Sequence, residues 1–162
     1  LGLALWATGN VDARFLAILI VTPAMLAPEE LEALLRSNDF IPVSDWFNSY
    51  VLKAHPQKDR LRVRFMADPQ PVVARAGWSL TAERVEKAPD GLDLGGLLDR
   101  LAAEMPGADP VVQWTMNTTL AGIGIHHPQH RARVLAMGEA MGIFRDYPTP
   151  KGCTSPFVPL WV

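Results

Sequence analysis

The chain has 162 residues, of which 49% are hydrophobic and 20% are charged, so it suits one compact domain with a core large enough to fold unaided. A net charge of -2 and an isoelectric point near 6.1 exclude a strongly basic protein that holds nucleic acid through phosphates over its whole surface. Any DNA partner must therefore be held by a local patch.

Apolar runs and cysteine usage point to a cytoplasmic protein. The longest apolar run, residues 16–26, is interrupted by Thr22 and Pro23 and falls short of the roughly 20 residues that cross a bilayer. No segment resembles a secretory signal, and the single cysteine, Cys153, excludes an internal disulfide and fits a reducing compartment. Because the chain lacks an initiator methionine, we expect further residues before Leu1 in the full protein.

Helix signals follow one another from the start of the chain, and strand-like alternation is nearly absent. Asn10 is a candidate cap for a helix over residues 11–21, and Pro28, followed by two glutamates, opens the next helix. Asp39 is expected to cap a third helix, which has Pro42 in its first turn and contains PVSDWFNSY, residues 42–50.

Later helices are delimited by proline and glycine. We expect them over residues 59–67, 71–87, 94–105, 110–125 and 130–142. After Gly142 the chain becomes rich in proline, which predicts a helical domain over residues 1–146 and a carboxy-terminal tail over residues 147–162.

Two segments resemble each other in a way that favours stacked helix pairs. ADPQPVVARAGW (67–78) and ADPVVQWTMN (108–117) share Ala-Asp-Pro followed by Val-Val, and the step between the Val-Val pairs is 39 residues. This step is close to the roughly 40 residues of HEAT-type repeats. The prediction is an all-α, HEAT-like α-solenoid of stacked antiparallel helix pairs, with an irregular helical bundle as the alternative.

Helical spacing groups several polar and aromatic side chains that could share one groove. Asp45 and Asn48 form the first group, on a face away from the more apolar stripe of Val43, Phe47 and Tyr50. The second group pairs the cation of Arg75 with an exposed Trp78 ring, and the third consists of Trp114, Asn117 and Thr118.

A groove with one acid, one base and flat rings suits a flat or cationic ligand lying against a polyanion. Each residue also has a plain structural alternative. Asp45 could pair locally, Trp78 and Trp114 could belong to the core, and Arg75 could form an ion pair between repeats.

Other candidate sites are weaker. HHPQH contains three histidines, His126, His127 and His130, but Pro128 breaks the helix and no cysteine or carboxylate lies nearby in sequence, so we expect no metal. No phosphate-binding loop or nucleophile motif is present, and no cofactor is expected. Two basic groups are either DNA-binding patches or solvated helix faces: Lys58, Arg60, Arg62 and Arg64, and Arg131 with Arg133.

Four stretches, in order, resemble the DNA alkylation repair enzyme family, the AlkD-like glycosylases built from HEAT-like repeats. These stretches are LWATGNVDARFLAILI, VSDWFNSYVLK, PVVARAGWSL and VVQWTMNTTLAGIGIHHP. The resemblance implies a metal-free DNA glycosylase that hydrolyses the N-glycosidic bond of cationic alkylated purines in double-stranded DNA. It places the family's catalytic aspartate on Asp45 and its arginine beside the DNA backbone on Arg75.

The sequence departs from the family pattern at two positions. The resemblance implies tryptophans around the lesion, but Ile41 and Thr118 stand at those positions, and Trp46, Trp78 and Trp114 are the candidates to replace them. The alternative function is therefore a catalytically inactive HEAT-like scaffold that binds DNA or a protein partner. The sequence gives no indication of the oligomeric state.

Overall fold

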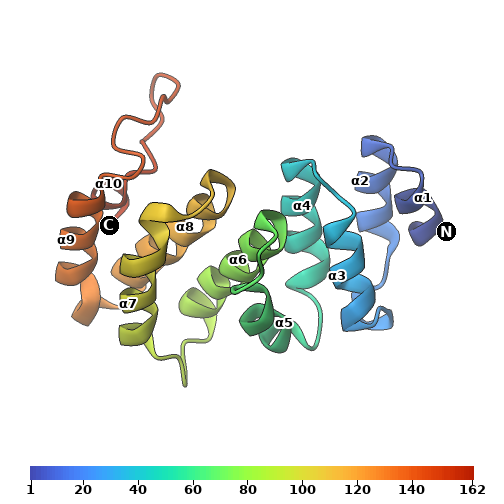
Figure 1. Ribbon diagram of the computed structural model, residues 1–162, viewed down its shortest axis with the longest axis horizontal. Coiled ribbons are helices and arrows are strands. Elements are labelled where there is room, and N and C mark those ends of the chain that lie inside the picture. Colours follow the sequence, from blue (N-terminus) through green and yellow to red (C-terminus); the bar gives the residue numbers. More distant parts are fainter. The chain divides into compact units, whose positions relative to one another are not determined.

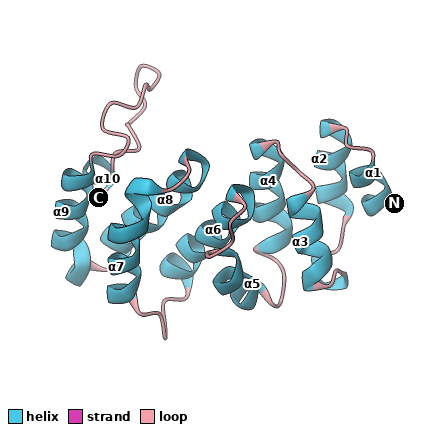
Figure 2. Ribbon diagram, in the orientation of Figure 1, coloured by secondary structure: helices cyan, strands magenta, loops and turns pink.

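The computed structural model describes residues 1–162 and contains helices, turns and loops but no strand (Figure 2). The predicted all-α class is confirmed. The chain divides into two compact units, Leu1–Leu80 and Thr81–Val162, and each is described by itself. The division expected at residue 146 stays a prediction. No helix is both long and apolar enough to span a bilayer.

The helices follow one another with short connections, except for the long segment of residues 142–157 before the last helix (Figure 1). The first unit holds α1 (Gly2–Ala7), α2 (Val11–Ile20), η1 (Pro23–Met25), α3 (Pro28–Arg36), α4 (Ile41–Phe47), η2 (Asn48–Leu52), α5 (Lys58–Phe65) and the first part of α6 (Pro71–Lys87). The second holds the rest of α6, α7 (Leu94–Glu104), η3 (Met105–Gly107), α8 (Pro110–His126), η4 (Pro128–His130), α9 (Arg131–Met141) and α10 (Val158–Trp161).

Most predicted helix starts are confirmed, and one is wrong. Asn10 caps α2 by accepting a hydrogen bond from the backbone N–H of Ala13, and Pro28 begins α3. Asp39 does not cap α4, because Phe40 is the residue before the helix and no side chain caps it. The buried amide of Asn38 fixes this helix start instead, by donating to the carbonyl of Phe40 and to Oγ of Ser44.

The repeated segments have the same local construction. Asp68 accepts a hydrogen bond from the N–H two residues later, and so does Asp109. The helices that follow, α6 and α8, each begin with proline, 39 residues apart, and each is 17 residues long. The shared Ala-Asp-Pro therefore marks an Asx turn that starts a long helix in each unit.

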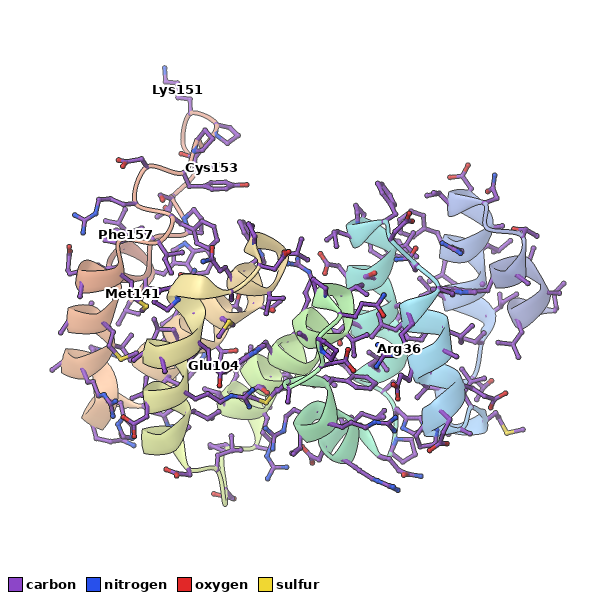
Figure 3. All side chains as sticks on the ribbon, in the orientation of Figure 1. Arg36, Glu104, Met141, Lys151, Cys153 and Phe157 are labelled. Carbon is purple, nitrogen blue, oxygen red and sulfur yellow. The ribbon has the colours of Figure 1, made fainter.

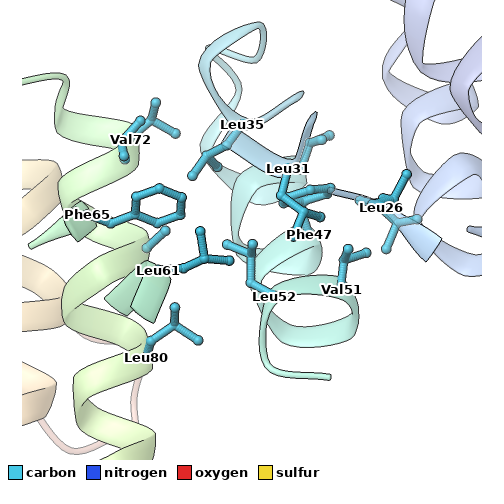
Figure 4. Packing of buried hydrophobic residues seen from close by; sticks show 14 of the residues in the cluster. Leu26, Leu31, Leu35, Phe47, Val51, Leu52, Leu61, Phe65, Val72 and Leu80 are labelled. Atoms are coloured by element: carbon cyan, nitrogen blue, oxygen red, sulfur yellow. The ribbon is translucent and has the colours of Figure 1, made fainter. Parts of the chain in front are cut away.

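The core of the first unit lies among α3, α4 and α5 (Figure 4). Its inward side chains include Leu31 and Leu35 of α3, Phe47 of α4 and Phe65 of α5, all almost inaccessible to solvent. Burial of such side chains stabilises the fold by roughly 1.5 to 3 kcal/mol each. This core fixes the orientation of α4, on which Asp45 lies.

A π-helical turn follows α4 and changes which of the following side chains face the core. The N–H of Lys53 bonds to the carbonyl of Asn48, five residues back, so one extra residue is inserted in the turn. Val51 and Leu52 consequently point inward and are fully buried, while Tyr50 is 53% exposed. The prediction that Tyr50 lies on the apolar stripe is wrong for this reason.

An ion network ties the end of α3 to the turn before α6. The guanidinium of Arg36, labelled in Figure 3, forms salt bridges with Glu32 and Asp68 and donates a hydrogen bond to Gln70. Burial by itself raises the pKa of Asp68, but the hydrogen bonds from Arg36 and from the N–H of Gln70 outweigh it and lower that pKa below its ordinary value of 3.8. Hydrogen bonds with Asp68 and Glu32 raise the pKa of Arg36.

Asp68→Asn is expected to destabilise the protein by about 2 kcal/mol at neutral pH, because a charged hydrogen-bond partner is lost. Because the folded pKa of Asp68 is below 3.8, the carboxylate contributes its full stability above that pH and loses it as the pH falls through the folded pKa. Urea unfolding at pH 7 and pH 3 measures both effects. The difference between wild type and variant should shrink at pH 3, and an equal difference at both pH values would contradict the role of the ionised carboxylate.

The carboxy-terminal tail packs on its own chain within the second unit. Pro159 and Val158 of α10 lie against Gly138 of α9, and Val162 lies against Gly124 of α8. Both glycines leave room for these contacts, since a Cβ at either position would collide with the tail side chains. Figure 3 shows Lys151 and Cys153 on the loop that projects beyond Phe157.

Candidate functional site

Asp45 and Arg75 form a bidentate ion pair between α4 and α6. Nε of Arg75 lies 2.7 Å from Oδ1 of Asp45, and Nη2 lies 2.8 Å from Oδ2. The Asp45 side chain is 46% exposed, whereas that of Arg75 is 9% exposed. The two hydrogen bonds from the buried guanidinium thus fix the orientation of the carboxylate, which is half exposed to solvent.

This geometry brings together the two residues that the sequence singled out for chemistry, but it changes the relation between them. A phosphate contact needs an accessible guanidinium edge, and Arg75 turns its fork toward Asp45. We therefore interpret Arg75 as the group that positions the Asp45 carboxylate. Its assignment as a DNA backbone contact has no support from the geometry.

Asn48 makes a second polar bridge between the same two helices. Its Nδ2 donates to Oγ of Ser79, one turn beyond Arg75 on α6. The residue is only 4% exposed, and its Oδ1 is buried without a hydrogen-bond partner. Asn48 therefore helps to hold α4, which carries Asp45, against α6, and it presents almost no surface to DNA.

Trp78 belongs to the core, and the prediction of an exposed ring beside Arg75 is wrong. Its side chain is 1% exposed and is among the largest fully buried ones in the protein. The physical reason is that residues 72–78 of α6 are all buried, so no side of the helix in this stretch faces solvent. The spacing of three between Arg75 and Trp78 carried no information about exposure.

Trp114, in the second unit, is partly buried and packs against two rings that follow α9. Its ring packs against Phe144 at 5.4 Å and Tyr147 at 5.6 Å between ring centroids. Phe144 and Tyr147 also contact each other edge to face. Phe144 and Tyr147 therefore complete a three-ring cluster with Trp114 of α8, which no local pattern in the sequence indicated.

Asn117 and Thr118 are likewise engaged within the second unit. Asn117 is 1% exposed and donates to the carbonyl of Pro156 in the tail at 2.8 Å. The Thr118 hydroxyl donates to the carbonyl of Trp114, one turn back on α8. A groove shared by these residues and Asp45 stays a prediction.

An exposed ring cluster lies next to Asp45, and Trp46 is the only one of its members that the sequence predicted as a candidate ring. Trp46 of α4 is 41% exposed, packs against Phe15 of α2 at 5.0 Å and against Tyr50 of η2 at 5.2 Å between ring centroids. The spacing of four between Trp46 and Tyr50 was a usable signal. A regular α-helix would place Tyr50 on the core side, and the π-helical turn is what leaves it exposed beside Trp46.

The basic groups are partly neutralised by neighbours. In the first unit, Arg62 lies 3.7 Å from Asp59, and Arg64 lies 2.5 Å from Glu32. In the second, Arg133 pairs with Asp99, and Arg131 donates to the carbonyl of Gly124. These contacts are typical of solvated, locally paired helix faces.

The histidine cluster shows a structural contact. Nε2 of His127 lies 2.9 Å from the carbonyl oxygen of Val85 and links α8 to the end of α6 within the second unit. No group of three or more histidine, cysteine, aspartate or glutamate side chains is arranged to hold a metal ion.

The exposed face of α4 presents one fixed carboxylate, that of Asp45, next to the exposed ring of Trp46.

Comparison with solved structures identifies the fold. A structure described as "a new family of proteins related to the HEAT-like repeat DNA glycosylases with affinity for branched DNA structures" matches with a TM-score of 0.79. The match covers 98% of this chain and 69% of that chain at 16% sequence identity. The HEAT-like fold is thereby confirmed over the irregular helical bundle.

Comparison by sequence identifies the family. No curated protein sequence matches the chain significantly. The family model described as "DNA alkylation repair enzyme" matches residues 1–141, which is most of the chain and includes both Asp45 and Arg75. The protein is therefore a member of the DNA alkylation repair enzyme family.

Proposed function

We propose that this protein binds double-stranded DNA containing cationic alkylated purines and hydrolyses the N-glycosidic bond of the damaged nucleotide. The observation that supports this proposal is the half-exposed Asp45 carboxylate, fixed by two hydrogen bonds from the buried Arg75. Membership of the DNA alkylation repair enzyme family, matched over residues 1–141, supports alkylated DNA as the substrate.

The reaction needs little from the protein, because a cationic base is already a good leaving group. The bond between the base nitrogen and the sugar C1′ breaks, and its electron pair leaves with the base, which becomes neutral. Positive charge develops on the sugar, and a carboxylate close to it stabilises that charge. Water then adds to C1′ and loses a proton, which Asp45 can accept, leaving free alkylated base and an abasic site.

Arg75 has a defined part in this proposal. The bidentate pairing fixes both carboxylate oxygens, so that no reorganisation is needed when charge develops. Lysine at this position would keep the charge but lose the planar fork. Arg75→Lys is therefore expected to lower kcat more than it lowers DNA affinity.

Asp45→Asn is expected to lower the rate of base release by roughly 100-fold, because the neutral amide no longer stabilises the developing cation. The measurement is release of N7-methylguanine from alkylated duplex DNA, with the spontaneous rate subtracted. The matched control is Asp12→Asn, which removes an exposed carboxylate from the first turn of α2 in the same unit. Equal release by wild type and Asp45→Asn would remove Asp45 from the mechanism.

A second candidate function is DNA binding without base removal. It is favoured by Ile41 and Thr118, which stand where the family resemblance places rings, and by the packing of Trp114 against Phe144 and Tyr147. The structural relative is described as having affinity for branched DNA. Salt-dependent binding of DNA without base release would favour this function, and a protein-binding scaffold would show no DNA binding at physiological salt.

A further inference from the structure

We propose that Phe15, Trp46 and Tyr50, here called the aromatic platform, form a stacking surface for an unpaired base of single-stranded or branched DNA. The proposal rests on the proposed function only in requiring that the protein binds DNA. It does not require that Asp45 removes a base. Ring surfaces accept bases of any sequence, because every base has a flat π-face.

The platform is built from two helices that lie side by side in the first unit (Figure 1). Trp46 is central, with Phe15 of α2 meeting it at an interplanar angle of 72° and Tyr50 of η2 at 41°. The three rings hold one another in place. Trp46 and Tyr50 nevertheless keep 41% and 53% of their surface exposed, so they are fixed before a ligand arrives and lose little side-chain entropy on binding.

The π-helical turn explains why Tyr50 belongs to this surface. In a regular helix, Tyr50 would continue the inward stripe of Val43 and Phe47, which are buried. The extra residue in η2 lets Val51 and Leu52 fill the core and leaves Tyr50 outside. Such insertions are frequent at functional sites, and here the insertion exposes a large ring at no cost to core packing.

The surroundings of the rings fit a nucleic-acid strand. The outward face of α4 and η2 also carries Asp45, Ser49 and Lys53, all at least partly exposed. Lys53 lies three residues beyond Tyr50, so its ammonium can reach a phosphate next to a base on the rings. Polar groups alternating with rings distinguish this face from the continuous apolar centre of a protein interface.

The platform also differs from the carboxylate site in what it contacts. Asp45 is directed toward Arg75 of α6, whereas the neighbouring Trp46 is directed toward Phe15 of α2. One helix therefore presents the carboxylate on one flank and the rings on the other. A base stacked on the rings would place its strand along α4 beside Asp45.

Fluorescence titration of the full chain with a thymine oligonucleotide and with a blunt duplex tests the platform. Trp46→Ala and Tyr50→Ala are each expected to weaken binding of the single strand by roughly 5- to 100-fold, while duplex binding changes less than about twofold. Single-strand binding should also quench tryptophan emission in wild type. Trp46→Phe, which preserves packing, should remove that quenching, and the control Trp161→Phe, at a 36% exposed indole of α10, should retain it.

The outcomes separate this proposal from the proposed function. If the alanine variants bind single strands as well as wild type does, the platform is not a base-stacking surface. The same conclusion follows if the substitutions lower single-strand and duplex affinity together. Neither result bears on base release, which is tested separately with Asp45→Asn. If wild type binds no DNA, both proposals fail. If wild type self-associates and Trp46→Ala is monomeric, the rings are an interface between copies of the chain and the proposal is overturned.

Discussion

Trp78→Ala is expected to lower the free energy of unfolding by about 3 to 5 kcal/mol, the cost of removing a fully buried indole and leaving a cavity. The side chain is 1% exposed and lies in the stretch of α6 that is buried on every side. Neighbouring groups cannot fill so large a space without moving the helix. Equilibrium urea unfolding, followed by circular dichroism, measures the loss.

The matched control is Trp46→Ala, which removes the same side chain from an exposed position. It loses contacts with Phe15 and Tyr50 but opens no cavity, so the expected loss of stability is about 1 kcal/mol or less. The two variants should therefore show opposite patterns, with Trp78→Ala losing stability and Trp46→Ala losing single-strand binding. A Trp78→Ala variant as stable as wild type would contradict the assignment of this ring to the core.

Gly77→Ala is expected to destabilise the protein by about 3 kcal/mol, although alanine is intrinsically the better helix former by about 1 kcal/mol. A Cβ at this position would meet the backbone nitrogen of Met66 and lie 2.6 Å from the carbonyl carbon of Phe65. These are backbone atoms of the α5 end, so no side-chain rotation can relieve the overlap. The two helices would have to separate, next to Arg75.

Gly122→Ala is the control for this prediction. Gly122 also lies inside a long helix, α8, but a Cβ there would make only an ordinary contact, 3.7 Å from Cγ1 of Val85. Alanine should therefore stabilise the protein by about 0.5 to 1 kcal/mol. Equilibrium urea unfolding of both variants measures these changes in the free energy of unfolding. A Gly77→Ala variant that gains stability as Gly122→Ala does would show that α5 and α6 are less closely packed than described.

The helix starts could be predicted from sequence because their causes are local. Asn10 bonds to a backbone N–H three residues away, and Pro71 and Pro110 occupy first-turn positions where no hydrogen bond from their nitrogen is needed. The same holds for the Asx turns at Asp68 and Asp109. The 39-residue step between two such starts was enough to indicate a HEAT-like repeat.

Exposure of individual rings could not be predicted, because it depends on neighbours distant in sequence. Trp78 is buried since α6 is surrounded in that stretch, and Trp114 is partly buried against rings 30 and more residues later in the chain. Tyr50 is exposed because one turn is π-helical, a change that the apolar pattern does not reveal. Periodicity gives the relative orientation of side chains on one helix, but only packing decides which sides are covered.

The sequence by itself determined the all-α fold class and singled out Asp45 and Arg75 as the candidate site residues. Only the tertiary structure decided how the two residues interact. Arg75 is buried and donates hydrogen bonds from Nε and Nη2 to Asp45, whose carboxylate stays half exposed. Their separation of 30 residues carries no geometric information. The pair forms because α4 and α6 pack together, and a guanidinium removed from water requires a carboxylate to bind.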